Sequence, residues 1–129
     1  MKDEIVKEWF ERGSRDFETA KLIFSQRGFN DEIMFLLQQA VEKYLKGFLI
    51  YAGWELRKIH DVETLLTEAM EFDQSFAQFL DFGRKLSAYY YEGRYPPGPI
   101  PEISTAEIKS SINIADKIIT EVSKKVNLR

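Results

Sequence analysis

The side chains best suited to chemistry in the first half of this chain form a regular pattern around residue 42. Gln38, Glu42 and Lys46 follow one another at intervals of four, and Gln39 and Lys43 keep that interval beside them. On an α-helix, residues four apart lie on one face, so two ammonium groups and two amides line one edge, where they can bind a phosphate or a partner's carboxylate. The same spacing also predicts a Glu42–Lys46 ion pair on an exposed face, which contributes only about 0.2–0.5 kcal/mol. Both interpretations stay open at this point.

His60 and Asp61 form a second candidate site. His60 is the only imidazole of the chain, and an imidazole can act as a pH-sensitive ligand group. A lone His before a helix start also commonly hydrogen-bonds the backbone and orders the turn. The chain has no Cys and no second His, which excludes disulfides, thiolate metal sites, cysteine nucleophiles and any site built from two imidazoles. Arg57, not Glu, stands three residues before His60, and no Gly-x-Ser-x-Gly motif occurs, so neither a di-metal carboxylate site nor a Ser–His hydrolase is expected.

The segment YYYEGRYPP, residues 89–97, is the third candidate. Three consecutive tyrosines on a helix point about 100° apart, so they cannot all enter the core. Tyr91 and Tyr95 then flank Arg94 near the surface, where aromatic rings and a guanidinium can stack on a base or clamp a phosphate. Arg94 can equally pair with a carboxylate of the helix expected at residues 30–52 and fix the crossover, and the sequence does not decide between these two roles.

The length and composition predict one domain spanning residues 1–129. The chain is 44% hydrophobic and has a net charge of −3, which excludes a disordered chain and argues against nucleic-acid binding by bulk charge alone. The charge is uneven: residues 61–82 hold six acidic and no basic side chains, and residues 83–129 hold eight basic and five acidic ones. A basic surface facing a phosphate-bearing ligand is therefore possible, although ordinary solvated helix faces give the same pattern.

Apolar residues recur at helical spacing almost everywhere, and no stretch alternates with period two, which predicts an all-α fold. All four prolines lie between residues 93 and 101, so that segment is not helical. The fold class is an up-and-down four-helix bundle with one additional helix. The expected helices span residues 2–26, 30–52, about 62–70, 73 or 75 to 92, and from 105 through at least 122.

The helix ends carry recognisable signals. Gly28 is placed to take the left-handed conformation after the first helix, and Gly53 stops the second. Asn30 and Asp61 are expected to cap the helices that follow them, and Ser104 with a Glu three residues later has the form of a capping box. Charges recur through the N-terminal residues, so no signal peptide is expected; with no long apolar run, the chain is expected to be cytoplasmic and to have no membrane partner.

Together these features resemble a known family, the HEPN domain (higher eukaryotes and prokaryotes nucleotide-binding). The resemblance covers nearly the whole chain, and the run QAVEKYLK at residues 39–46 is its most specific part. The other matching features, in chain order, are Asp16 with Ala20, the run His60-Asp61-Val62 and the run Arg94-Tyr95-Pro96.

The resemblance implies a prokaryotic helical bundle that forms a homodimer and needs no cofactor. It also implies pairing with a minimal nucleotidyltransferase protein, often encoded next door, as a toxin–antitoxin or operon partner. Many members are metal-independent ribonucleases with an Arg-x4–6-His motif, in which His acts as acid or base and Arg stabilises the phosphate transition state. This sequence departs from that motif, because no His follows Arg84 or Arg94 and Arg57 lies too close to His60.

The resemblance therefore implies a non-catalytic HEPN protein that binds a nucleotide, a nucleotidyltransferase partner, or both. The binding residues carried over are Lys43, Lys46, His60, Arg94 and Tyr95, with no catalytic and no metal-binding residue. Two alternatives stay open: a metal-independent ribonuclease with an atypical site around His60 and Arg94, and a purely structural dimerisation module.

Overall fold

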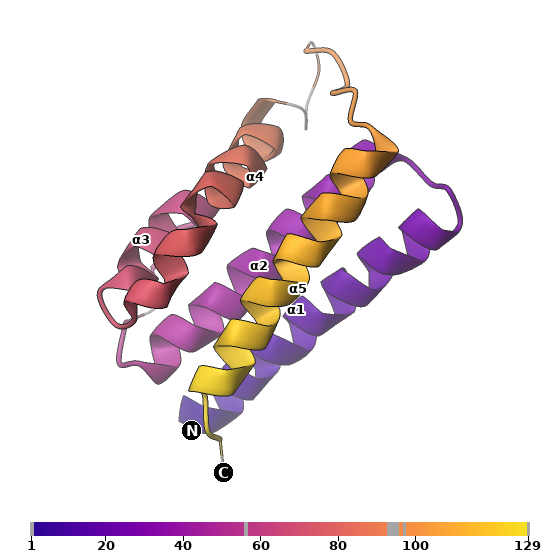
Figure 1. The fold of residues 1–129 in the computed structure, drawn as a ribbon. Helices are drawn as coiled ribbons and strands as arrows, with labels where there is room; N and C mark the ends of the chain where they lie inside the picture. Colours follow the sequence, from indigo (N-terminus) through magenta and orange to yellow (C-terminus); the bar gives the residue numbers. More distant parts are fainter. Residues whose placement is uncertain (1, 56, 93–95, 97, 129) are drawn as a thin grey trace.

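The computed structural model describes residues 2–55, 57–92, 96 and 98–128. Over these residues the chain forms five α-helices and one 3-10 helix and no strand, which confirms the all-α fold class. Four long helices alternate in direction, and the short α3 lies beside α4 as the additional helix (Figure 1). The elements are α1 (Lys2–Ser25), α2 (Asn30–Tyr51), α3 (Val62–Met70), η1 (Gln74–Phe79), α4 (Leu80–Glu92) and α5 (Thr105–Lys125).

Helix α2 is the centre of the bundle. Three of its four leucines, Leu37, Leu45 and Leu49, are fully buried, and burying one such side chain contributes about 1.5–3 kcal/mol. Helices α1, α3, α4 and α5 all pack against α2, so its apolar positions must cover most of its circumference. A polar side chain on α2 is therefore surrounded by protein wherever a neighbouring element covers it.

Helices α1 and α2 approach closely through small residues. A Cβ at Gly13 would lie 2.8 Å from Cδ2 of Tyr44 and 3.2 Å from the carbonyl oxygen of Ala40. The Tyr44 ring in turn stacks on Phe10 at 5.2 Å between ring centres. Gly13 thus lets the two helices pack along their length (Figure 1).

The turn between α1 and α2 differs from the prediction. Arg27, not Gly28, has the left-handed conformation, with φ of 58°. The Arg27 N–H donates to the carbonyl of Phe24 and the Gly28 N–H to that of Ile23, which is a Schellman ending of α1. Glycine is needed at 28 for space, because a Cβ there would lie 2.4 Å from Cγ2 of Ile23. Helix α1 accordingly ends at Ser25.

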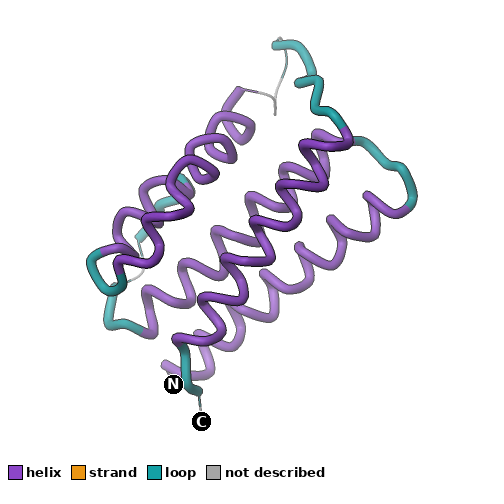
Figure 2. Tube along the Cα trace, in the orientation of Figure 1, coloured by secondary structure: helices purple, strands orange, loops and turns teal. Residues whose placement is uncertain are grey.

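The prediction that Asn30 caps α2 is also wrong. Phe29 occupies the cap position without a side-chain hydrogen bond. The Asn30 Nδ2 instead donates to the carbonyl of Ile103 at 2.7 Å, which ties the start of α2 to the segment before α5. Figure 2 shows these two connections, in teal, at the same end of the bundle.

Other predicted helix ends are confirmed. Asp61 caps α3 by accepting from the Thr64 N–H, and Ser104 caps α5 by accepting from the Glu107 N–H. Gly53, with φ of 107°, follows the end of α2. The helix expected from residue 73 or 75 to 92 is divided, since η1 comes first and α4 begins at Leu80. No stretch in any helix described here is long and apolar enough to cross a membrane.

Candidate functional site

The polar pattern on α2 forms a buried network rather than an exposed edge. Gln38, Glu42 and Lys46 are only 1%, 4% and 3% exposed. The Glu42 Oε2 accepts from the Lys46 Nζ at 2.8 Å and lies 2.9 Å from the His60 Nδ1, and its Oε1 accepts from the Gln38 Nε2 at 3.0 Å. The predicted Glu42–Lys46 pair is therefore present, but the expectation that it lies on an exposed face is wrong. We call Gln38, Glu42, Lys46 and His60 the Glu42 network.

The segment between α2 and α3 covers this network. The Gln38 Nε2 also donates to the carbonyl of His60 at 3.0 Å, so one amide fixes both the Glu42 carboxylate and the backbone of the covering segment. On the side of α1, the indole of Trp9 lies against Lys46, with the ammonium 5.5 Å from the ring centre. Such a contact favours a desolvated cation. Burial of the charges thus depends on residues far from α2 in the sequence.

The Glu42 carboxylate sets the tautomer of His60. A carboxylate only accepts hydrogen bonds, so the 2.9 Å contact requires a proton on Nδ1 of the imidazole. The Lys46 Nζ, 3.4 Å from the same nitrogen, then makes no hydrogen bond to it. In the neutral ring Nε2 is left as the acceptor, and the His60 side chain is 52% exposed. The His60 carbonyl is thus fixed by Gln38 and its ring by the Glu42 side chain rather than by the backbone; a role as a pH-sensitive ligand group stays a prediction.

Lys43 is paired as well. Its Nζ lies 2.5 Å from Oδ2 of Asp16 on α1, and both side chains are about one-fifth exposed. A shallow groove of about 450 Å³ lies beside this pair, and we call it the α1–α2 groove. It is lined by Ile5, Glu8, Trp9, Arg12 and Lys43. Arg12 pairs with Glu8 at 2.8 Å, so both cations of the groove already have carboxylate partners.

Asp61, next to His60, connects α3 to α4. Its Oδ1 accepts from the Ser87 hydroxyl and its Oδ2 from the hydroxyl and the N–H of Thr64. Burial alone would raise the pKa of Asp61, but these hydrogen bonds outweigh it and leave the pKa below its ordinary value. Asp61 is therefore a charged structural cap that fixes the position of the His60 turn.

Only part of the tyrosine-rich segment is among the described residues. Arg94 and Tyr95 lie outside the described residues. The Tyr89 hydroxyl donates to Oε1 of Glu107 at 3.2 Å, and Lys85 pairs with the same carboxylate at 2.6 Å. Burial, followed by the nearby Glu107 charge, raises the pKa of Tyr89. Glu107 thus links α4 to α5. Its carboxylate bonds Tyr89 and Lys85 rather than the Ser104 N–H, so the second hydrogen bond of the predicted capping box is not formed.

Of the five predicted site residues, Lys46 and His60 lie together in the Glu42 network. Lys43 pairs with Asp16 beside the α1–α2 groove. The sequence interpretation missed Trp9, which lines the α1–α2 groove and contacts Lys46. Trp9 lies three residues after Val6 and directly before Phe10, a position that is equally typical of a core residue, so the pattern does not mark it as part of a site. Among the residues with described positions, no three carboxylate or imidazole groups are arranged to hold a metal ion.

The fold and the network define a class: an all-α bundle whose central helix carries a buried Gln–Glu–Lys–His cluster beside a turn. The family model for the HEPN domain matches residues 6–126. The chain belongs to the HEPN domain family.

Solved structures agree with this assignment. The chain is 27% identical to ST0689, an archaeal HEPN homologue, with a TM-score of 0.75 over 95% of this chain and 98% of that one. It also resembles TT1696 from Thermus thermophilus in fold, with 23% identity and a TM-score of 0.81 over 94% and 98% of the two chains. No significant match was found among curated proteins.

Proposed function

We propose that this HEPN protein acts by binding rather than by catalysis, as a homodimer that takes a nucleotide, a minimal nucleotidyltransferase partner, or both. The observation that carries the proposal is the state of the cation beside the only imidazole: Lys46 lies 3.4 Å from the His60 ring, but it is buried and paired with Glu42, so it is not free to stabilise a phosphate transition state. The proposed setting is the cytoplasm of a prokaryote, in a toxin–antitoxin-like pair.

The sequence around His60 supports a role without catalysis. In the ribonuclease motif an Arg stands five to seven positions before the His, and this chain has Gly53, Trp54 and Glu55 there. The developing charge of a phosphate transition state would thus lack the family's guanidinium at that place. The nearest cation to the imidazole in the Glu42 network, Lys46, is buried against Glu42.

The α1–α2 groove supports nucleotide binding. Its volume of about 450 Å³ falls in the usual range for small-molecule sites, about 300–1,000 Å³. The Trp9 indole offers a planar face for a base, and base–aromatic stacking contributes about 1–3 kcal/mol. A phosphate reaching Lys43 or Arg12 must compete with Asp16 or Glu8, so we expect modest, salt-dependent affinity.

Tryptophan fluorescence can test the nucleotide part of this proposal. In a Trp54→Phe background the remaining Trp9 reports on the groove, and this substitution also removes a buried indole N–H that lacks a partner. ATP or GTP should quench Trp9, and Lys43→Met should weaken binding several-fold. Lys117→Met, on the exposed face of α5, is the matched control. If neither nucleotide changes the signal and calorimetry detects no heat, the nucleotide part is wrong.

Co-expression tests the partner part. The product of the adjacent gene should co-purify with the chain, and light scattering on a size-exclusion column should give twice the monomer mass. A dimer that retains neither nucleotide nor neighbour would favour a purely structural dimerisation module instead. A strict monomer that retains neither would contradict the proposal as a whole.

One observation favours the ribonuclease alternative. A carboxylate that holds the Nδ1–H of an imidazole leaves Nε2 as a base, as in catalytic Asp–His pairs, and His60 is half-exposed. Incubation with total RNA in EDTA should then give cleavage that disappears in His60→Ala. Cleavage that survives this substitution would point to a contaminating nuclease, and absence of cleavage would support the binding role.

A further inference from the structure

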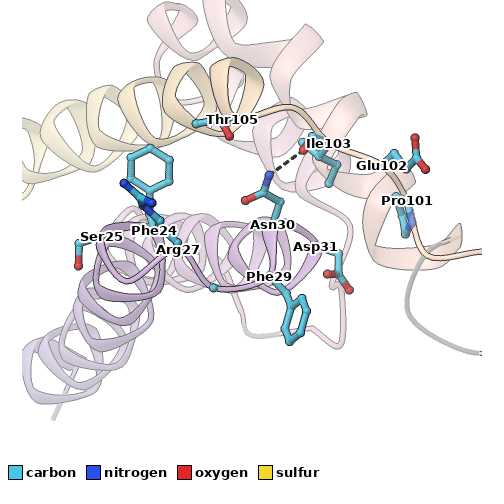
Figure 3. Close-up of a pocket in the computed structure, with 11 residues that line it drawn as sticks. Phe24, Ser25, Arg27, Phe29, Asn30, Asp31, Pro101, Glu102, Ile103 and Thr105 are labelled. Atoms are coloured by element: carbon cyan, nitrogen blue, oxygen red, sulfur yellow. Dashed lines mark hydrogen bonds between the residues drawn. The ribbon is translucent and has the colours of Figure 1, made fainter.

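An open hollow of about 680 Å³ lies at the end of the bundle where α1 turns into α2. Figure 3 shows its walls, formed by the α1–α2 turn on one side and by the segment before α5 on the other. The hydrogen bond from Asn30 to the Ile103 carbonyl joins these walls (Figure 3). Apolar side chains contribute much of the lining, namely Phe24, Phe29, Pro101 and Ile103. We call this cavity the turn hollow.

The Phe29 side chain is unusually exposed, although hydrogen bonds fix the backbone of the turn that carries it. Its side chain is 79% exposed, and Figure 3 shows its ring projecting away from Ile103. The Phe29 carbonyl accepts from the Ile33 N–H, and the two residues before it form the Schellman ending of α1. The ring is therefore presented by a hydrogen-bonded turn, beside a hollow with apolar walls, and it contributes little to the core of its own chain.

Opposite charges flank Phe29 at equal distance along the chain. Arg27 lies two residues before it and Asp31 two residues after it, and both line the turn hollow. Within the part of the chain that is described, neither side chain has a hydrogen bond or an ion pair. In a two-fold arrangement whose axis passes between the Phe29 ring and the hollow, the Arg27 side of the turn in one copy can lie opposite the Asp31 side in the other. The patch is therefore complementary to itself in charge, and it pairs a projecting ring with a hollow.

We propose that the turn hollow binds a second copy of this chain across a two-fold axis. Phe29 of each copy fills the hollow of the other, and Arg27 of each copy pairs with Asp31 of the other. An isologous contact of this kind uses one patch twice, and an aromatic anchor in an apolar pocket with polar groups at its rim is typical of the centre of an interface. This inference rests on the homodimer in the proposed function and names its interface.

The aromatic anchor can be tested by sedimentation velocity over a range of protein concentrations. Phe29→Ala should raise the dimer dissociation constant by about tenfold or more. Because the ring is mostly exposed, the variant should keep the helical circular dichroism of the unchanged protein and, at a concentration where both proteins are monomeric, its melting temperature. Phe72→Ala, which removes another exposed ring on a different part of the surface, is the matched control and should not change the dissociation constant.

The flanking charges allow a stricter test. Arg27→Glu alone and Asp31→Arg alone should each weaken the dimer, since each places like charges opposite one another. An equal mixture of these two variants should form a heterodimer, and the double variant should again form a homodimer. Asp116→Arg on the exposed face of α5 controls for net charge. Recovery in the mixture is expected only when positions 27 and 31 face each other across the axis.

The outcomes separate this interface from the proposed function. A dimer that is unaffected by all three substitutions means that the chain dimerises elsewhere, which overturns the interface and leaves the homodimer standing. A monomer at every concentration overturns both. If Phe29→Ala leaves the dimer intact but abolishes capture of the nucleotidyltransferase partner, the hollow binds that partner and the two-fold interface is wrong.

Discussion

Removing the negative charge of Glu42 should destabilise this protein far more than its place in a helix suggests. Glu42→Gln keeps the shape of the side chain but leaves the Lys46 ammonium, whose side chain is 4% exposed, without its carboxylate. In the same variant the proton on the His60 Nδ1 faces a neutral amide oxygen. The perturbation therefore separates the charge of residue 42 from its packing.

The magnitude follows from the burial of the pair. Removing one partner of a buried ion pair costs about 3–5 kcal/mol, and the contact of Lys46 with the Trp9 ring offsets about 1 kcal/mol of this. We therefore expect Glu42→Gln to lower the free energy of unfolding by about 2–4 kcal/mol. Lys46→Met should cost less, about 1–3 kcal/mol, because Glu42 keeps Gln38 and His60 as donors.

Urea denaturation followed by circular dichroism at one fixed protein concentration measures these values, since dimerisation would otherwise couple to stability. Glu8→Gln is the matched control: the Glu8–Arg12 pair has the same 2.8 Å separation and the same spacing, but both side chains are about 60% exposed, so it should cost at most about 0.5 kcal/mol.

The double variant Glu42→Gln/Lys46→Met should cost little more than Lys46→Met alone, because no unpaired charge is left in it. If the two single costs simply add, or if Glu42→Gln costs no more than Glu8→Gln, the Glu42 network does not hold a desolvated ion pair and the reasoning is refuted.

Two further predictions concern the packing of the bundle. Lys125, together with hydrogen bonds from Ser75, holds the pKa of Asp73 down to about 2, below its ordinary 3.8. The folded state thus favours the charged form, and this contribution is complete above a pH of about 4 and lost as the pH falls towards about 2. Asp73→Asn should therefore lower the urea midpoint at neutral pH and show a smaller acid-induced decrease; parallel acid profiles of the two proteins would contradict this. Gly13→Ala should lower the melting temperature and cost about 1–2 kcal/mol, despite the better helix propensity of Ala, because its Cβ meets Tyr44 at 2.8 Å; an unchanged or higher melting temperature would show that the ring moves aside freely.

The helices and several of their ends were predictable because they depend on neighbouring residues. Apolar spacing places α1, α2 and α5 correctly to within a few residues at their ends. Asp61 and Ser104 act as caps because a short polar side chain satisfies N–H groups only three residues away. These features require no knowledge of what packs against the helix.

The wrong predictions depended on partners distant in the sequence. Asn30 has the side chain of a good cap, but the carbonyl of Ile103, 73 residues away, accepts its amide hydrogen instead. The spacing of Glu42 and Lys46 is identical for a surface pair and a buried one. Only the segment that ends at His60 and the indole of Trp9 determine that this pair is desolvated.

The run at residues 39–46, the most specific part of the family resemblance, must be interpreted by the pairing of its lysines. Both of its lysines, Lys43 and Lys46, have carboxylate partners within the chain, namely Asp16 and Glu42. A basic side chain so engaged positions helices and must exchange one carboxylate for another anion before it can hold a phosphate. The run therefore encodes the junction of α1, α2 and the His60 turn. Trp9 in the α1–α2 groove and the half-exposed ring of His60 have no carboxylate to displace before they contact the proposed ligand in this way.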